Sequence, residues 1–285
     1  MTTTVIIGGV AGGMSAATRL RRRDEDMEII VLEASGHVSF ANCGLPYHLS
    51  GTIRGREQLL LQTPESLKSR FNLDVRVNTR ATAINAEAQT VTTSTGETIA
   101  YDNLILSPGA APIQAPGALT LRNVEDLDAM KEAIEGGPQV MAPLDPEMAA
   151  IVAKRLEDNG VKVVTGTIVK DISELDSDVV IAAIGVHPAI ELAESAGLET
   201  NRGIVVDDMM HTSDPNIYAV GDAVEKRHAN DGELTLVPLA QTANRHGCLV
   251  ADVITGRTTK AKQVLGAAVV GVDGGYLTWS LAGGA

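Results

Sequence analysis

Thr4-Val5-Ile6-Ile7-Gly8-Gly9-Val10-Ala11-Gly12-Gly13 stands near the start of a chain of 285 residues. Its β-branched first part, Thr4 to Ile7, predicts a short buried strand, and the glycine-rich part after it predicts a tight turn. A second strand is expected over Glu28 to Leu32, ending at Glu33. Between them a helix is predicted, because apolar residues recur at helical spacing; they are Met14, Ala17 and Leu20. The chain therefore begins with a βαβ unit, whose crossover helix lets the two strands pair in parallel.

The composition excludes several classes of protein. The chain has 36 acidic and 23 basic side chains and a formal net charge of −13, so its surface would repel nucleic acid. No apolar run approaches the roughly eighteen residues that a membrane helix needs, and the N-terminus lacks the pattern of a signal peptide. Two cysteines, Cys43 and Cys248, cannot build a disulfide framework for this length and fit a reducing compartment. We expect a cytoplasmic protein with neither a membrane nor a nucleic-acid partner.

The first half of the chain continues with short strands separated by turns. A buried strand over Leu104 to Leu106, closed by Ser107-Pro108-Gly109, follows them, and a helix is predicted over Val124 to Glu135. The short strands that precede Leu104 predict an antiparallel meander. They are expected over Val75 to Val77, Ala83 to Asn85, Thr90 to Thr93 and Thr98 to Tyr101.

The second half alternates between helices and strands. A helix is predicted to start at Asp145-Pro146, and a strand over Val179 to Ile184 is apolar enough to be buried on both faces. The other predicted strands are Val161 to Val164, Ile217 to Val220, Val264 to Gly271 and Tyr276 to Ser280, and the other helices are Pro188 to Ala196 and Ala240 to Thr255.

The glycine turn is similar to the dinucleotide fingerprint G-x-G-x-x-G, although its middle glycine is replaced by Val10. The turn follows a strand, opens a helix, and is followed about twenty-five residues later by an acid, Glu33. Free N–H groups at the helix start suit a pyrophosphate, and Glu33 can accept hydrogen bonds from a ribose. The alternative is a glycine-rich turn in a generic α/β protein.

Four stretches resemble one enzyme family. Ser39-Phe40-Ala41-Asn42-Cys43-Gly44-Leu45-Pro46-Tyr47 is similar to the active-site signature of the coenzyme A disulfide reductases, a branch of the FAD-dependent pyridine-nucleotide-disulfide oxidoreductases that also contains NADH oxidases and polysulfide reductases. The other three stretches are Tyr101 to Gly109, Thr212 to Asp222 and Pro238 to Ala240.

This resemblance implies an α/β fold and a cofactor. It predicts a Rossmann-like FAD-binding domain, with a parallel sheet and an antiparallel meander, built from residues 1–120 and 200–262. A reduced second α/β lobe over 121–199 would be the remnant of a nicotinamide-binding domain, and 263–285 a remnant of the interface domain with a tail. The residues predicted to bind FAD are Gly8, Gly9, Val10, Ala11, Gly12, Gly13, Glu33, Ala34, Asn42, Cys43, Ser107, Pro108, Gly109, Gly221, Asp222, Pro238, Leu239 and Ala240.

The same resemblance assigns catalysis to Cys43, with Asn42 and Ser39 beside it. A cysteine beside a flavin can reduce disulfides only as a thiolate, and we expect N–H groups of the following segment, Gly44 to Leu49, to favour that form. The alternative is a buried structural cysteine, which is how we interpret Cys248.

Coenzyme A is an anion, so its site requires positive charge. The resemblance places it among Ser15, Arg19, Arg22, Ser39, Asn42 and Asn244. A solvated helix C-terminus explains the arginines equally well, because cations are favoured there. The six histidines show no metal-ligand spacing, and we expect no metal.

The chain also departs from the family. The nicotinamide-binding fingerprint is missing, since Gly136-Gly137 leads straight into Pro138, and most of the interface domain is missing as well. We therefore expect a monomer or weak oligomer, with NAD(P)H as a doubtful donor. Three hypotheses remain: an enzyme passing electrons from NAD(P)H through FAD to Cys43 and a disulfide such as coenzyme A disulfide or a persulfide, an FAD-binding core without efficient turnover, and an NADH oxidase or polysulfide reductase.

Overall fold

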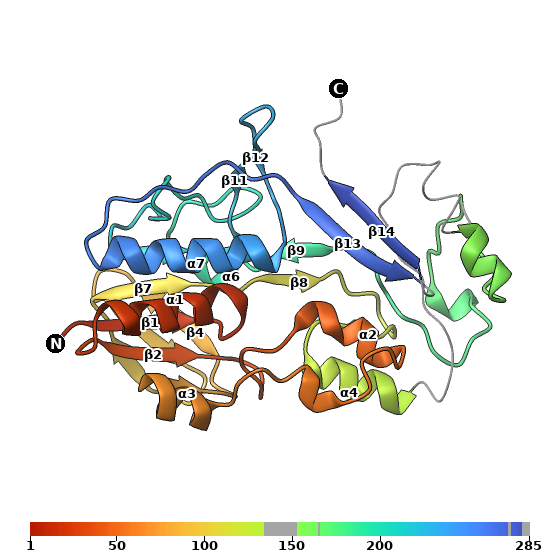
Figure 1. Ribbon diagram of the computed structural model, residues 1–285, viewed down its shortest axis with the longest axis horizontal. Helices are drawn as coiled ribbons and strands as arrows, with labels where there is room; N and C mark the ends of the chain where they lie inside the picture. Colours follow the sequence, from red (N-terminus) through yellow and green to blue (C-terminus); the bar gives the residue numbers. More distant parts are fainter. Residues whose placement is uncertain (134–152, 165, 273–274, 281–285) are drawn as a thin grey trace.

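A five-stranded parallel sheet forms the centre of the protein. The computed structural model describes residues 1–133, 153–164, 166–272 and 275–280 (Figure 1). The strands lie in the order β10-β7-β1-β2-β3, and every neighbouring pair is parallel. They are β1 (Thr3–Ile7), β2 (Glu28–Leu32), β3 (Asp74–Arg76), β7 (Asn103–Leu106) and β10 (Ile217–Ala219). Strands from both ends of the chain therefore build one sheet.

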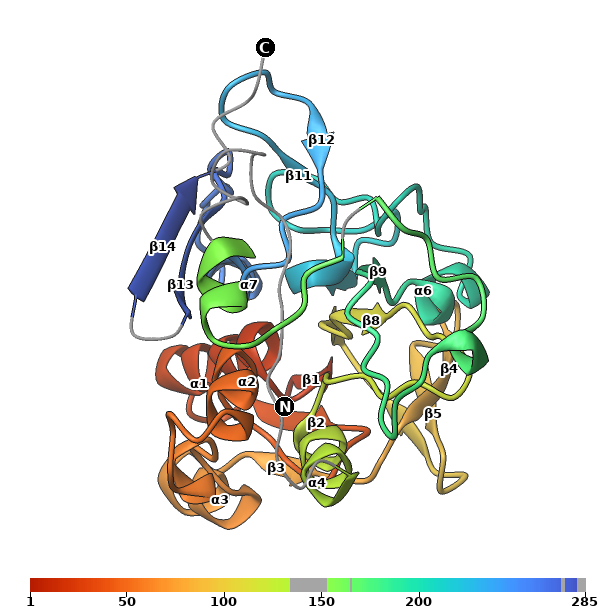
Figure 2. The same cartoon turned by 90° about the vertical axis from the view of Figure 1, so that its right-hand side faces the viewer.

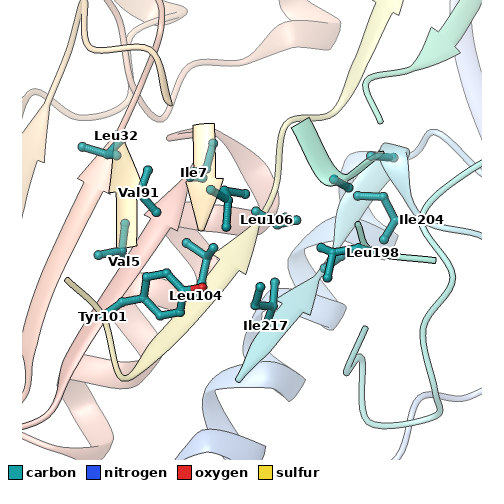
Figure 3. Packing of buried hydrophobic residues seen from close by; sticks show 14 of the residues in the cluster. Val5, Ile7, Leu32, Val91, Tyr101, Leu104, Leu106, Leu198, Ile204 and Ile217 are labelled. Carbon is teal, nitrogen blue, oxygen red and sulfur yellow. The ribbon is translucent and has the colours of Figure 1, made fainter. Parts of the chain in front are cut away.

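Both faces of the three central strands β7, β1 and β2 are buried, which is why each of them contains an unbroken apolar run. Side chains alternate along each strand, so Val5 and Ile7 of β1 enter one cluster and Ile6 enters the other. The first cluster, shown in Figure 3, includes Leu104 and Leu106 of β7. The alternation of side chains along the strands thus produces a core on each side of the sheet.

Two helices, α1 (Ala11–Arg23) and α7 (Ala240–Ile254), cover one face and run side by side (Figure 1). Gly247 makes this close packing possible, because a Cβ there would collide with the carbonyl oxygen of Gly12 and lie 3.0 Å from the Ala16 nitrogen. The two helices predicted at these places are confirmed, and the bounds predicted for α7, Ala240 to Thr255, are correct to within one residue.

The other face is covered by a three-stranded antiparallel sheet of β4 (Ala81–Asn85), β5 (Thr90–Thr93) and β6 (Thr98–Ala100). The predicted meander is confirmed for these strands but is wrong for the segment at Val75. That segment is β3, which pairs in parallel with β2. The reason is helix α3 (Pro64–Phe71), which was not predicted and supplies the crossover that parallel pairing needs. Its start carries a reciprocal cap between Thr63 and Ser66.

The middle of the chain has little regular structure. After α4 (Val124–Ala133), the helix predicted from Asp145 begins outside the described residues, although 153–158 are helical. The predicted strands over Val161 to Val164 and Val179 to Ile184 are wrong, since neither range forms a strand. Ile181 makes a single bridge to Leu119, and Ile184 is 61% exposed. A run of apolar residues becomes a buried strand only where neighbouring strands pair with its backbone, and among the described residues only Leu119 forms backbone hydrogen bonds with this run, to Val180 and Ala182.

Short elements complete the fold. A hairpin near the C-terminus, the pair predicted as strands at 264–271 and 276–280, lies apart from the central sheet in both views (Figures 1 and 2). Its strands are β13 (Ala267–Val272) and β14 (Gly275–Ser280). The remaining elements are η2 (Arg56–Gln58), β8 (Ala110–Pro112), η3 (Ile172–Glu174), β9 (Val186–Pro188), α6 (Glu191–Ser195), β11 (Lys226–Arg227) and β12 (Leu234–Thr235).

Candidate functional site

The glycine turn lies at the carboxyl end of β1, where ligands bind in open parallel sheets. Gly8 has φ +102°, a conformation that L side chains rarely adopt, and a Cβ there would collide with the backbone carbonyl of Ser107. A Cβ at Gly13 would collide with the carbonyl oxygen of Gly8. These two positions therefore require glycine. Val10, which replaces the middle glycine of the dinucleotide fingerprint, is the N-cap of α1 and is accommodated at this turn.

The start of α1 offers unpaired amides to an anion. The Met14 N–H bonds the Val10 carbonyl, so the amides of Ala11 to Gly13 have no acceptor within the helix. No side chain caps this end, and its first turn contains no acidic residue. The helix dipole adds positive potential at the same place. The local chemistry suits a diphosphate.

Glu33 follows β2 and is almost completely buried. Its Oε2 accepts a hydrogen bond from the Gly9 N–H at 2.7 Å, and its Oε1 accepts from the Ser35 N–H and Oγ, both at 2.8 Å. Glu33 is therefore fixed against the glycine turn, as a ribose acceptor would need to be. Ala34, which follows it, is exposed.

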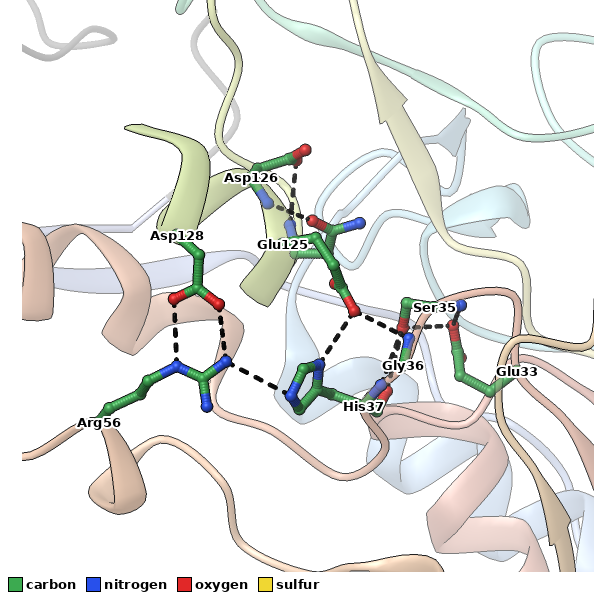
Figure 4. A network of polar contacts seen from close by, with 9 residues as sticks. Glu33, Ser35, Gly36, His37, Arg56, Glu125, Asp126 and Asp128 are labelled. Atoms are coloured by element: carbon green, nitrogen blue, oxygen red, sulfur yellow. Dashed lines mark hydrogen bonds and ion pairs between the residues drawn. The ribbon is translucent and has the colours of Figure 1, made fainter. Parts of the chain in front are cut away.

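A polar network extends from Ser35 to α4 (Figure 4). The Gly36 N–H donates to Glu125 Oε1 at 2.8 Å, and His37 Nδ1 lies 3.0 Å from the same oxygen. Arg56 donates two hydrogen bonds to Asp128, at 3.1 and 2.7 Å, and these hydrogen bonds lower the pKa of Asp128. The network attaches the loop after Glu33 to α4.

Three of the other predicted segments meet the glycine turn at one point. A Cβ on Gly12 would lie 2.7 Å from Ser107 Oγ and 3.5 Å from the Ala243 carbonyl oxygen. A Cβ on Gly221, which has φ +85°, would lie 3.6 Å from the Ala243 Cβ and 3.7 Å from Ser107 Oγ. The structure thus brings together the first turn, the end of β7, the turn η4 (Gly221–Ala223) and helix α7.

The segment that contains Cys43 is attached to the same turn. Ser39, in a left-handed conformation with φ +49°, donates its N–H to the Gly9 carbonyl oxygen at 2.8 Å. Cys43 follows in η1 (Asn42–Gly44), before helix α2 (Leu45–Leu49), and its side chain is exposed. Asn42 Nδ2 lies 3.5 Å from the Arg122 carbonyl oxygen, while its buried Oδ1 has no partner among the described residues. An exposed thiol and an unpaired acceptor therefore lie beside the dinucleotide turn.

Asp222 carries a charge in a partly buried position of η4. Burial raises the pKa of this carboxyl above its ordinary value, and the charges of Arg122 and Lys226 counteract that rise. The Arg122 guanidinium lies against Gly109, whose φ of +76° places the backbone after Pro108 close to it. The positive charges of Arg122 and Lys226 thus act on the carboxylate of Asp222, which is predicted to bind the cofactor.

Helix α7 begins at Ala240, after the exposed Pro238 and the N-cap residue Leu239. This helix also lacks a side-chain cap and an acid in its first turn. An uncapped helix start stabilises negative charge that develops near it. Pro238 to Ala240 thus open a helix, as the sequence predicts. Their contact with a flavin stays a prediction.

Three of the residues predicted to bind coenzyme A, Ser15, Arg19 and Asn244, lie along the seam between α1 and α7, whereas Ser39 and Asn42 lie in the segment of Cys43. Ser15 Oγ donates to Asn244 Oδ1 at 3.0 Å, so these two are brought together. Arg19 donates two hydrogen bonds to Asp252, at 3.0 and 2.9 Å, and these lower the pKa of Asp252. Arg22 is exposed. The charge of Arg19 is therefore balanced by an acid that sequence reasoning did not consider.

A neighbouring arginine fits the alternative interpretation of the cluster. Arg21 donates to backbone carbonyls, including those of Phe71 at 2.9 Å and Met27 at 2.7 Å, and so fastens the end of α1 to the segment before β3. Arg21 thus fixes the helix end, whereas Arg19 faces the seam.

A metal-binding cluster and a membrane-spanning helix are both absent from the part of the chain that the structure describes. No group of three or more His, Cys, Asp or Glu side chains is arranged to hold a metal ion. None of the helices is long and apolar enough to cross a membrane.

Sequence reasoning missed several residues that shape this site. Gly247 was missed, although small residues at helical spacing, Ala243, Gly247 and Ala251, signal a close helix contact. Lys226 and His246, both buried, carry no local signal, because only the fold brings them together.

Comparison with known proteins identifies the class of this chain. It belongs to the pyridine nucleotide-disulphide oxidoreductase family, whose profile matches residues 2–136 and 127–247. The chain is similar to an NADH oxidase of Methanocaldococcus jannaschii, at 32% identity over 93% of this chain and 72% of that protein. It is also similar to a coenzyme A disulfide reductase of Staphylococcus aureus, at 31% identity over 90% of this chain and 71% of that protein.

Solved structures agree with this assignment. The reduced Bacillus anthracis CoADR-RHD matches with a TM-score of 0.89 and 39% identity, covering 95% of this chain and 60% of that chain. An NAD-dependent persulfide reductase from A. fulgidus matches with a TM-score of 0.89 and 31% identity, covering 95% of this chain and 62% of that one. This chain thus spans about three fifths of either structure. The α/β fold and the family-level prediction, an oxidoreductase of the class that uses FAD and NAD(P)H, are confirmed.

Proposed function

We propose that this chain is an FAD-dependent reductase of small disulfides, in which electrons from NAD(P)H reach Cys43. The observation that supports it most directly is the hydrogen bond from the Ser39 N–H to the Gly9 carbonyl oxygen, at 2.8 Å. This bond connects the segment of the exposed thiol to the turn that suits a dinucleotide.

The residues present fit FAD at this place. The glycine positions leave room only for backbone, the starts of α1 and α7 are uncapped, and Glu33 is fixed as an acceptor. Asn42 Oδ1 is a buried acceptor that still lacks a donor among the described residues. A bound flavin would supply a carrier of two electrons beside the thiol.

The role of Cys43 follows from thiol chemistry. Its thiolate Sγ attacks one sulfur of the disulfide, the S–S bond breaks, and the first product leaves as a thiolate. The second half of the substrate stays bound to Cys43 as a mixed disulfide. Two electrons then break this bond, release the second thiol after protonation, and restore the Cys43 thiolate. One disulfide and one NAD(P)H with a proton thus give two thiols and NAD(P)⁺.

We infer that an anionic disulfide such as coenzyme A disulfide, or a persulfide, binds along the α1–α7 seam. Ser15, Arg19 and Asn244 face this seam, and two relatives are a coenzyme A disulfide reductase and a persulfide reductase. The arginines would attract the phosphates of such a substrate against the overall charge of −13.

We also infer that the second lobe, residues 121–199, is a shortened nicotinamide-binding domain. The alignment with the M. jannaschii relative runs over 325 positions, which is more than the 285 residues of this chain. The relative therefore contains residues that have no counterpart in this chain. The exposed apolar side chains of Val164, Ile168 and Ile184 are consistent with a lobe that lacks part of its sheet. Reduction by NAD(P)H should therefore be slow.

The test uses the protein loaded with FAD and kept free of oxygen. After reduction by dithionite, mixing with coenzyme A disulfide should reoxidise the flavin in the wild type and in the control Cys248→Ser, but not in Cys43→Ser. Reoxidation of Cys43→Ser at the wild-type rate would falsify the assigned role.

The oxidised protein, mixed with NADH in a stopped-flow instrument, tests the donor. Bleaching of the flavin supports the complete reductase. If only dithionite bleaches it, the chain is an FAD-binding core without NADH-driven turnover. Turnover with oxygen or polysulfide and none with coenzyme A disulfide would instead identify the oxidase or polysulfide reductase.

A further inference from the structure

Lys226 is a lysine with an unusual position. It lies in β11, 4% of its surface is exposed, and lysine is seldom buried unless it is paired. Its Nζ donates to the carbonyl oxygen of Gly221 at 2.6 Å and to that of Val224 at 2.8 Å. Both acceptors belong to the turn that carries Asp222, so the ammonium group connects the two ends of this turn by hydrogen bonds.

The charges around Lys226 are few. The Asp222 carboxylate faces it from η4 and is the charge that favours the ammonium form, while burial lowers the pKa of Lys226 to about 8. His246 faces it from α7, and burial together with the charges of Lys226 and Arg245 lowers the pKa of this imidazole to about 4. His246 is therefore neutral at physiological pH and adds no second positive charge.

Two other charged groups lie close but are engaged elsewhere. Glu225, the neighbour of Lys226 in sequence, is buried with Arg202 Nε 3.4 Å from its Oε1. Arg122, just before α4, also acts on Asp222. Lys226 and Arg122 thus place two positive charges against one carboxylate, and the carbonyl dipoles of Gly221 and Val224 do not neutralise the excess.

We propose that Lys226 is a positioning residue for the cofactor: it fixes the turn from Gly221 to Val224 so that Asp222 faces the bound dinucleotide, and it provides positive charge behind that site. This proposal rests on the proposed binding of FAD at the glycine turn. A dinucleotide diphosphate adds negative charge nearby, which favours the ammonium form of Lys226 further. Binding should therefore be linked to the protonation of this side chain.

The linkage fixes a direction for the pH dependence. Below pH 8 the ammonium group is already charged in the free protein, and binding gains its full contribution. Above pH 8 the free protein must take up a proton in order to bind, so the affinity for FAD falls as the pH rises. A lysine that only fills space would give no such slope.

The experiment titrates the apoprotein with FAD between pH 6.5 and 9.5 and follows flavin fluorescence. The wild type and Lys260→Met, which removes an exposed lysine, should bind with the same affinity and lose affinity above pH 8. Lys226→Met should bind about tenfold more weakly at pH 7, the order expected for the loss of a charge-assisted hydrogen bond. It should also lose the pH dependence above pH 8.

Adding Asp222→Asn to Lys226→Met gives a second readout. If the lysine acts through the carboxylate, the double variant should bind only slightly more weakly than Asp222→Asn alone. Full additivity, or a Lys226→Met profile that matches the wild type, overturns the proposal, and so does a wild-type affinity that stays flat to pH 9.5. That last result needs no variant to fold. A wild type that takes up no FAD instead overturns the proposed function itself, and the role of Lys226 with it.

Discussion

The replacement Gly247→Ala tests the close contact between α1 and α7. Gly247 lies in the middle of α7, facing α1 just after the dinucleotide turn. A Cβ at this position would collide with the carbonyl oxygen of Gly12 and lie 3.0 Å from the backbone nitrogen of Ala16. Both obstacles are backbone atoms, which cannot rotate away as a side chain can. One helix must therefore move relative to the other.

Two effects of opposite sign determine the outcome. Alanine is a better helix former than glycine by about 1 kcal/mol, which on its own would stabilise the variant. Overpacking of a well-filled interior costs about 1–3 kcal/mol, and a collision with fixed backbone falls in the upper part of that range. The net result should be a loss of about 1–2 kcal/mol in the free energy of unfolding. For a chain of this size, that loss lowers the melting temperature by roughly 2–3 °C.

Thermal unfolding followed by circular dichroism measures this shift, with Arg245→Ala as the control. Arg245 lies two residues away on the exposed side of α7, and its replacement should change stability by less than about 0.5 kcal/mol. Because the displaced helix also carries Ala243 away from Gly12, the affinity for FAD should fall in Gly247→Ala alone. A variant at least as stable as the wild type would show that helix propensity outweighs the contact, and the reasoning would be refuted.

Two further predictions concern the ends of the proposed site. Glu33→Gln keeps the shape of the side chain but turns an amide NH₂ toward the Gly9 or Ser35 N–H, so FAD should dissociate more readily and stability should fall by about 1–3 kcal/mol; equal retention of flavin would place the ribose elsewhere. Asp252→Asn frees Arg19, and the KM for an anionic disulfide should fall severalfold with kcat unchanged, whereas an unaltered KM would contradict the seam as the substrate site. The hydrogen bond with Arg19 lowers the pKa of Asp252. The carboxylate therefore stabilises the fold at pH values above its ordinary pKa of 3.8, and this stabilisation is lost as the pH falls below that value. In acid unfolding below pH 4, Asp252→Asn should therefore lose less stability than the wild type.

Local patterns were sufficient to predict the first βαβ unit. The strand Glu28 to Leu32 has the predicted bounds, and the glycine turn, α1 and α7 lie where their residues indicate. In these segments the apolar period, the glycines and the strand length all favour the same structure. The mutual approach of the turn, Ser107 and Gly221 followed from the family resemblance.

The predictions failed where the structure of a segment depends on other parts of the chain. Whether Val75 joins a meander or the parallel sheet depends on α3, which connects it to β2. The apolar run from Val179 to Ile184 remains outside a sheet because no strand of the described chain lies beside it. Lys226 and Asp252 are ordinary charged residues in the sequence. Asp252 is paired with the distant Arg19, and Lys226 is buried, and neither fact has a local signal.

The pairing of β10 with β7 joins residues more than a hundred positions apart, and Ala243 reaches Gly12 across an even longer separation. During synthesis on the ribosome, the N-terminal strands and α1 therefore emerge long before the segments that complete their surroundings. A nascent chain of some two hundred residues holds the glycine turn but neither η4 nor α7. Capture of the flavin should consequently wait until the segment from Gly221 to Gly247 has left the exit tunnel.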